Sequence, residues 1–199
     1  MSKKGYAFES HLEDFFLSFT GQTKHDPILK TTSAGVIQIN RSFRVPASGA
    51  MDALAGDVIT YLPWLQQQFK VEAKERYEKT KMDGYVLNVE IEWINKNNEE
   101  AITDKQIPIL AIKFKRRSRN QVWWIMKKVD LTKLIEPINN QVALDIGSVK
   151  VRVNKTRIKL IHKELSDINM ITEFSLNDED YLLIPHHVFN DVMERLKNV

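Results

Sequence analysis

The stretch GDVITYLPWLQQQFKVEAKER, residues 56–76, contains the pattern from which the rest of the fold can be built. Apolar and polar side chains alternate near both of its ends, which is typical of strands, and PWLQQQ between them predicts a turn. The two strands are therefore expected to form a hairpin-like pair. Asp57 then lies at the start of the first strand, and Glu72 and Lys74 share one face of the second, because side chains two residues apart in a strand point the same way.

A hairpin of this length can bring the carboxylate of Asp57 beside that of Glu72. Two carboxylates on adjacent strands are typical of a site for a hard divalent cation such as Mg²⁺, and Mn²⁺ could take its place. The backbone carbonyl of Ala73 is a candidate further ligand, and Lys74 could orient a water and favour its deprotonation. Taken singly these features also fit a solvated, salt-bridged strand face and a turn aspartate after Gly56.

The rest of the chain predicts a mixed α/β architecture around this pair. Helical spacing of apolar residues indicates a helix at the N-terminus, dense apolar runs indicate two buried strands, and the C-terminal third contains a β-hairpin and a final helix. The expected elements are a helix over 5–20, strands over 107–115 and 120–128, a short helix over 130–138 beginning at Asp130, a hairpin over 143–165 and a helix within 177–199, with NDEDY (177–181) at its start. Residues 84–100 fit either a helix or a strand.

Composition limits the classes of protein that the chain can belong to. Of its 199 residues 43% are hydrophobic and none is cysteine, which excludes disulfide frameworks, thiolate metal sites and cysteine nucleophiles. No apolar run approaches the roughly 20 residues of a membrane span, and no apolar segment follows the N-terminal lysines as in a signal peptide. We therefore expect an intracellular, cytoplasmic protein without a membrane partner, and a viral or prokaryotic source is compatible with this. The phosphate-binding loop of nucleotide-driven motors is absent, so no nucleotide cofactor is expected.

Charge is distributed unevenly along the chain. Residues 1–163 hold 27 Lys and Arg against 18 Asp and Glu, whereas residues 164–199 hold 2 against 8. A basic body of this kind is typical of a protein that binds a polyanion. The strongest basic run contains Lys113, Lys115, Arg116, Arg117 and Arg119, for which contact with DNA phosphates and a solubilising turn are the two interpretations. A second basic stretch, residues 150–163, fits an extended DNA surface and an ordinary exposed face equally well.

Residues 5–128 resemble the archaeal-type Holliday junction resolvases, which belong to the Asp…Glu-x-Lys, or PD-(D/E)xK, nuclease superfamily. GYAFESHLEDFF is similar to their first helix, RVPASGAMDALAGDVIT to their Arg, Ser-Gly, Asp segment, and VEAKER to their strand with the metal-binding glutamate and the lysine. The residues that match these motifs are Glu9, Arg44, Ser48, Gly49, Asp57, Glu72 and Lys74. The resolvases usually carry proline before the aspartate, where this chain has Gly56.

The resemblance implies a restriction-endonuclease-like core over residues 1–128. Residues 129–199 lie outside the resemblance, and we expect them to form a C-terminal extension of β-hairpin and helix that packs on the core as one compact unit. It also implies a magnesium-dependent endodeoxyribonuclease, a homodimer and paired cuts in a four-way DNA junction. Glu9 would then reach the metal through a water, and Arg44 and Ser48 would approach the DNA backbone near the scissile phosphate.

Two other functions remain open from the sequence. One is a nuclease of the same superfamily that acts on duplex, flap or single-stranded DNA in replication, repair or restriction. The other is a DNA-binding protein without catalysis, whose affinity would come from the basic strands. The presence of Asp57, Glu72 and Lys74 together favours an enzyme, since a protein that only binds DNA has no need of all three.

Overall fold

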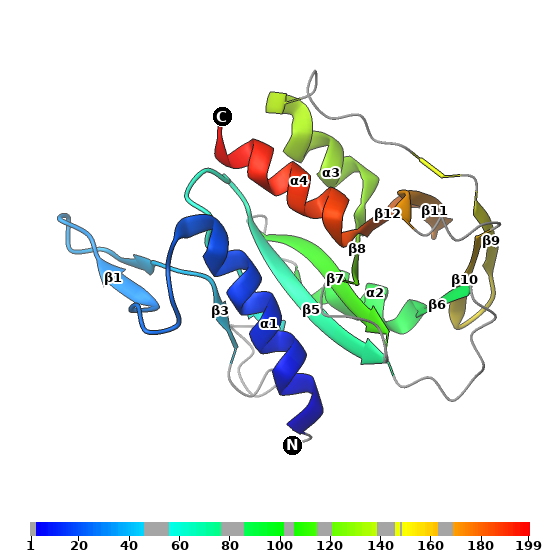
Figure 1. Ribbon diagram of the computed structural model, residues 1–199, viewed down its shortest axis with the longest axis horizontal. Coiled ribbons are helices and arrows are strands. Elements are labelled where there is room, and N and C mark those ends of the chain that lie inside the picture. The colour runs from blue at the N-terminus through cyan, green and yellow to red at the C-terminus, as the bar shows by residue number, and fades with distance from the viewer. Residues whose placement is uncertain are drawn as a thin grey trace.

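The computed structural model of the chain describes residues 3–45, 56–76, 86–101, 106–114, 121–138, 146–147, 149–162 and 169–199. These residues form three β-sheets and four α-helices (Figure 1). The helices are α1 (Lys3–Thr20), α2 (Ile91–Glu100), α3 (Lys128–Ile135), which is followed by the 3₁₀ turn η1 (Glu136–Ile138), and α4 (His186–Lys197).

A seven-stranded sheet is the centre of the molecule, with the strand order β11-β12-β8-β7-β5-β4-β3. Its strands are β3 (Phe43–Arg44), β4 (Val58–Ile59), β5 (Gln68–Arg76), β7 (Gln106–Phe114), β8 (Val122–Lys127), β11 (Thr172–Leu176) and β12 (Glu179–Pro185). The pair β5–β7 is parallel and the other pairs are antiparallel, so the expected central mixed sheet is confirmed. The strands at 58–59 and 68–76 also form the expected antiparallel pair, in which Val58 lies opposite Val71.

Helices α1, α3 and α4 cover one face of the central sheet (Figure 1). The apolar stripe of α1, which includes Phe8, Leu12 and Phe16, packs with Val71 of β5 in a single buried cluster. The same cluster takes in side chains of α3, α4 and the central strands, and Trp124 of β8 is completely buried in it. Burial of this apolar stripe is the main reason why α1 lies along β5, because most helical stability in proteins comes from packing of an amphipathic face.

A smaller layer covers the opposite face. It contains α2 and a three-stranded antiparallel sheet with the order β6-β10-β9, formed by β6 (Val86–Glu90), β9 (Val149–Val153) and β10 (Arg157–His162). Val89, Ile94, Ile158 and Leu160 of this layer pack with Leu110 and other central-strand residues in a second buried cluster. The central sheet therefore has a core on both faces, which suits the continuous apolar runs of β7 and β8.

The structure decides the segment that the sequence left open and differs from two expectations. Residues 86–90 are a strand and 91–100 are a helix, so the two interpretations of 84–100 each hold for part of it. Residues 177–181 do not begin a helix. Asn177 and Asp178 form the turn between β11 and β12 in the left-handed conformation that Asn and Asp tolerate, and α4 begins only at His186. Helix α3 begins at Lys128, two residues before Asp130.

Residues beyond 128 contribute strands to the central sheet and to the three-stranded sheet. β11 and β12 extend the central sheet beside β8, and β9 and β10 form most of the three-stranded sheet. The boundary expected between residues 128 and 129 stays a prediction, but elements from both sides of it share the two cores. None of the described helices is long and apolar enough to cross a membrane.

A two-stranded hairpin, β1 (Leu29–Thr31) with β2 (Ile37–Ile39), extends away from the body of the molecule, to the left of α1 in Figure 1. Its connection to the core runs through Arg41, whose guanidinium is buried with Glu13 of α1. The long connection expected over residues 22–47, with a short strand in GVIQIN, thus contains this hairpin and β3.

Candidate active site

The edge of β5 brings the sequence-predicted acidic residues together. β4 pairs with β5 only as far as Val71, where the backbone N–H of Asp57 donates to the Val71 carbonyl at 2.9 Å. The next contact along this edge is made by a side chain, because Asp57 Oδ2 accepts the backbone N–H of Ala73 at 2.8 Å. Asp57 is only 8% exposed and Glu72 6%, so both carboxylates are held in a largely buried position.

The backbone of β5 also determines where the Ala73 carbonyl lies. In a strand the N–H and C=O of one residue are directed to the same side, and they alternate between neighbours. The N–H of Ala73 is directed to Asp57, so its carbonyl lies on this same edge, as a metal ligand at this position would require. The expectation that Ala73 offers a backbone oxygen near Asp57 is therefore compatible with the register of β5, and its role as a ligand stays a prediction.

Glu72 and Lys74 lie on one face of β5, as the strand period predicts. The ammonium of Lys74 forms an ion pair with Glu72 Oε1. Their parallel partners on β7 are Leu110 and Ile112, which belong to the cluster beneath α2 and the three-stranded sheet. Glu72 and Lys74 are consequently on the side of the central sheet opposite α1, whereas Val71 faces α1.

Glu9 reaches the site from α1. Burial raises the pKa of the Glu9 carboxyl above its ordinary value, and the negative charges of Asp57 and, more weakly, Glu72 act in the same direction. A hydrogen bond from Arg44 and the charge of its guanidinium oppose this rise. The charges of Asp57 and Glu72 thus act on Glu9, although the three carboxylates come from three separate segments of the chain.

Arg44 is fixed by two partners on α1. Its Nη1 lies 3.4 Å from Glu9 Oε2, and its guanidinium lies over the Tyr6 ring at 4.1 Å from the ring centre. Tyr6 is not among the residues that the sequence motifs predicted for the site. The sequence does contain one indication of its role. Tyr6 lies three residues before Glu9, which places both side chains on the same side of a helix.

Lys70 is a second residue that the sequence analysis missed. It precedes Glu72 by two residues on the same face of β5 and is completely buried. Its Nζ lies 2.8 Å from Glu100 Oε2 and donates to the Asn97 carbonyl at 3.3 Å, so it ties β5 to α2. A lysine among alternating charged residues gives no sequence signal that distinguishes it from a solvated one.

Some of the basic residues predicted to contact DNA form ion pairs within the protein, and others lie outside the described residues. Lys113 lies on β7, where it pairs with Glu75 Oε1 at 3.2 Å and lies over the Phe8 ring at 5.8 Å. Farther along the same basic run, Lys127 and Lys128 pair with Glu179 and Glu173. The remaining predicted contacts fall outside the described residues, namely Ser48, Lys115, Arg116, Arg117 and Arg119.

The donor atoms at the site suit a hard cation held by few protein ligands. Asp57, Glu72 and the Ala73 carbonyl all offer oxygen, which Mg²⁺ and Mn²⁺ prefer. Among the residues that the structure describes, no three His, Cys, Asp or Glu side chains are grouped closely enough to hold a metal ion by themselves. Mg²⁺ commonly takes one or two carboxylates and completes its shell with water and substrate phosphate, so Asp57, Glu72 and the Ala73 carbonyl fit this cation.

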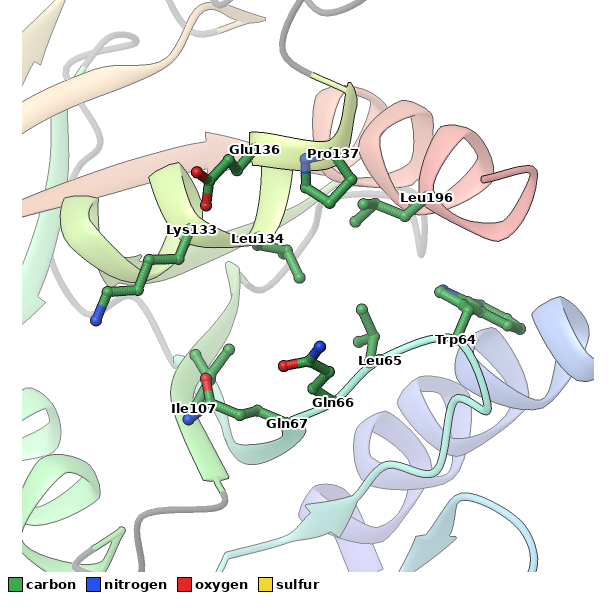
Figure 2. A pocket seen from close by; sticks show the side chains of 10 residues that line it. All are labelled: Trp64, Leu65, Gln66, Gln67, Ile107, Lys133, Leu134, Glu136, Pro137 and Leu196. Atoms are coloured by element: carbon green, nitrogen blue, oxygen red, sulfur yellow. The ribbon is translucent and has the colours of Figure 1, made fainter.

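A cavity of about 640 Å³ lies elsewhere on the molecule (Figure 2). It opens between the loop that precedes β5 and the helices α3 and α4, at the end where β5 and β7 begin. Its lining residues are Trp64, Leu65, Gln66, Gln67, Ile107, Lys133, Leu134, Glu136, Pro137 and Leu196. Among the described residues that line the cavity, Glu136 is the only carboxylate, whereas the edge of β5 carries both Asp57 and Glu72.

The fold and the site together define a class of nuclease. An aspartate at the start of one strand, with Glu-x-Lys on its antiparallel neighbour in a mixed sheet flanked by helices, is the arrangement of the PD-(D/E)xK superfamily. The chain belongs to the family described as "Phage putative PDDEXK endonuclease", whose model matches residues 1–178. It is thus a nuclease of this superfamily with a restriction-endonuclease-like fold.

Individual proteins resemble the chain less clearly than the family model does. No curated protein matches the chain. A solved structure with a similar arrangement is Hjc, a Holliday junction resolvase from the hyperthermophilic archaeon Archaeoglobus fulgidus. The two are 11% identical, the match covers 94% of this chain and 98% of that chain, and the TM-score is 0.43.

Proposed function

We propose that the chain is a divalent-metal-dependent endodeoxyribonuclease and that its substrate is a four-way DNA junction. The observation that carries the nuclease chemistry is the arrangement where β4 meets β5. There the Asp57 carboxylate accepts the Ala73 N–H, beside Glu72. The choice of substrate rests on the resemblance of residues 5–16, 44–60, 71–76 and 108–125 to the archaeal-type resolvases.

In this proposal Asp57, Glu72 and the Ala73 carbonyl hold the cation, Mg²⁺ or Mn²⁺, and Glu9 reaches it through a water. When bound there, the cation supplies Lewis-acid stabilisation of the phosphate and lowers the pKa of a bound water. The backbone N–H of Ala73 keeps the Asp57 carboxylate oriented. Lys74, held by Glu72, provides positive charge and orients the attacking water.

The surrounding residues position the DNA backbone. Arg44, held between Glu9 and Tyr6, presents its guanidinium with little freedom to reorient, which lowers the entropic cost of binding a phosphate. Ser48 would contact the backbone near the scissile phosphate, and the basic residues 113–119 would contact phosphates farther along. Symmetric cuts require two active sites, so the enzyme would act as a twofold dimer.

The experiment compares cleavage of a labelled four-way junction with cleavage of its separate duplex arms, in Mg²⁺ and in EDTA. We expect paired nicks in the junction that require the metal. Asp57→Asn keeps the size of the side chain but removes its charge, and should slow cleavage at least about a hundredfold, since loss of a few kcal/mol of transition-state stabilisation has this effect. Asp191→Asn on α4 is the matched control because that carboxylate is exposed and pairs with Arg195 of its own helix.

Binding measured in EDTA separates the outcomes. Unchanged junction binding with lost cleavage in Asp57→Asn supports the site, whereas wild-type cleavage by Asp57→Asn would refute it. Tight binding by the wild type without cleavage in Mg²⁺ or Mn²⁺ would mean a non-catalytic DNA-binding protein. Light scattering checks the dimer, and a monomer at the working concentration would contradict paired resolution.

A second candidate is a nuclease of the same superfamily that cuts duplex, flap or single-stranded DNA. The observation that favours it is the amount of sheet formed by residues 149–185, which lies outside the resemblance to the resolvases and could define another substrate. Equal cleavage of the junction and of its separate arms would decide for this candidate.

A further inference from the structure

The outer face of the three-stranded sheet carries a row of exposed basic side chains. Ile158 and Leu160 of β10 are buried in the second cluster and Val151 of β9 packs against it, so the residues that alternate with these three point outward. The outward residues include Lys159 on β10 and both Lys150 and Arg152 on β9, and all three are exposed. We call these three residues the basic row.

Two members of the basic row lie directly opposite each other. Lys159 and Arg152 are cross-strand partners in the antiparallel register of β10 and β9. Side chains at such positions have Cβ atoms roughly 5 Å apart, and like charges there destabilise the pair. If this face of the sheet bound nothing, we would expect opposite charges at such cross-strand positions.

The neighbouring position on the same face shows that alternation. Arg157 lies opposite Glu90 of β6 and donates to both of its carboxylate oxygens at 2.8 Å. Within the described part of the chain, no carboxylate pairs with the three residues of the basic row. The uncompensated charge is thus confined to one part of the face, while the adjoining arginine is neutralised.

The chemistry of the basic row fits a phosphate backbone. The outward residues of β9 and β10 described here are basic and none is aromatic, so the row has no platform on which bases could stack, as single-strand binders have. The basic row also lies on the same side of the molecule as part of the candidate active site. The three-stranded sheet covers the face of the central sheet on which Glu72 and Lys74 lie. DNA that is cut at that site would extend along this side of the molecule.

We propose that the basic row binds the phosphate backbone of a double-stranded DNA arm, independently of sequence and away from the cleavage site. This assignment rests on the proposed nuclease function, to which it adds a second contact with the substrate. Its role is to hold DNA, so it contributes to affinity and to the salt dependence of binding and leaves the rate of the chemical step unchanged.

The test is the charge reversal K150E/R152E/K159E, with K30E/K133E/K197E as the matched control. The control changes the same number of charges at exposed lysines on β1, α3 and α4. Binding of a 30-base-pair duplex of arbitrary sequence is measured by fluorescence anisotropy in EDTA over a range of salt concentrations. Cleavage is measured separately in Mg²⁺ at saturating DNA, and circular dichroism shows that each variant is folded.

We expect the reversal to raise the duplex Kd at least about tenfold and to reduce the salt slope of log K by about 2.7, the value for three lost phosphate contacts. The control should change both much less. The milder K150Q/R152Q/K159Q should show the same order of effects without introducing negative charge. The cleavage rate at saturation should equal that of the wild type.

The outcomes for the two proposals differ. If the reversal weakens binding no more than the control does, the basic row does not bind DNA, and an acidic protein surface becomes the alternative partner, whatever the nuclease assay shows. If the reversal weakens binding but the wild type cuts nothing in Mg²⁺ or Mn²⁺, the basic row stands as a DNA contact and the nuclease proposal fails.

Discussion

Gly56 holds the backbone just before Asp57 in a conformation that other residues avoid. Its φ is +101°, and proline, which the archaeal-type resolvases usually carry there, is restricted to about −65°. A Cβ at this position would also lie 2.9 Å from Cγ of Lys70. Since Lys70 is completely buried and its Nζ is held by Glu100, that side chain cannot easily withdraw. The departure from the family pattern thus coincides with a backbone conformation just before Asp57 that proline cannot adopt.

Gly56→Ala should therefore damage both stability and activity. A non-glycine residue in such a conformation costs on the order of 1–3 kcal/mol, and the contact with Lys70 is relieved by moving Asp57. We expect a loss of this size in urea denaturation and a fall in single-turnover cleavage. Gly21→Ala is the control, since Gly21 also has a positive φ, of 69°, but a Cβ there meets nothing within 4 Å. Unimpaired cleavage by Gly56→Ala would contradict the positioning role.

Among the elements, the connection between α1 and β3 depends on one buried arginine. Arg41 Nη1 lies 2.8 Å from Glu13 Oε1, and the two side chains are only 7% and 9% exposed. The same guanidinium donates to the backbone carbonyls of Asp26, Lys24 and Ser42. Hydrogen bonds from this one side chain thus help to hold the base of the β1–β2 hairpin, and no periodicity in the sequence predicts them.

Arg41→Ala should destabilise the protein by about 3–5 kcal/mol, because it leaves the buried carboxylate of Glu13 without its partner. The matched control is Asp14→Asn, which removes the exposed pair of Asp14 with Lys24 on the same helix and should cost no more than about 1 kcal/mol. Chemical denaturation measures both. A loss below about 1 kcal/mol for Arg41→Ala would show that Glu13 finds water or another donor.

At the scale of the whole molecule, His186 joins the C-terminal helix to the N-terminal one. Its ring lies at the start of α4, 4.8 Å from that of Phe15 on α1, and its Nδ1 accepts the indole N–H of Trp124 at 3.2 Å. Burial, with smaller contributions from the charges of His11 and His187, lowers the pKa of His186 to about 4. Only the neutral ring can accept the hydrogen bond from Trp124 at Nδ1.

This coupling predicts a pH dependence of stability. An unfolded histidine titrates near pH 6.5, so between about pH 6.5 and 4 the unfolded state binds the proton that the folded state excludes. The free energy of unfolding should therefore fall as the pH falls through this window, by about 2–3 kcal/mol in total from this group. His186→Asn should show a shallower dependence than the wild type in denaturation at a series of pH values.

The neighbouring His187 provides the control for that series, because its side chain is exposed. His187→Asn should keep the dependence of the wild type. If His186→Asn and the wild type lose stability in parallel between pH 6.5 and 4, the carboxylates alone account for acid unfolding and the assignment to His186 is wrong.

The sequence by itself determined the local parts of this protein. Alternation in residues 56–76 predicted both strands, their antiparallel pairing and the shared face of Glu72 and Lys74, because these properties depend only on strand period and a short connection. Helical spacing predicted α1 in the same way. Family membership agrees with the nuclease class to which those residues pointed.

The tertiary structure decided what depends on distant partners. Residues 86–90 became a strand because β10, more than 60 residues later, pairs with them, and residues 179–185 became a strand by pairing with β8. Contacts between separate segments also shape the site. They bury Lys70, which pairs with Glu100, and they hold Arg44 against Tyr6 and Glu9. Local periodicity holds no information about such contacts, since long-range pairing and packing override local propensity.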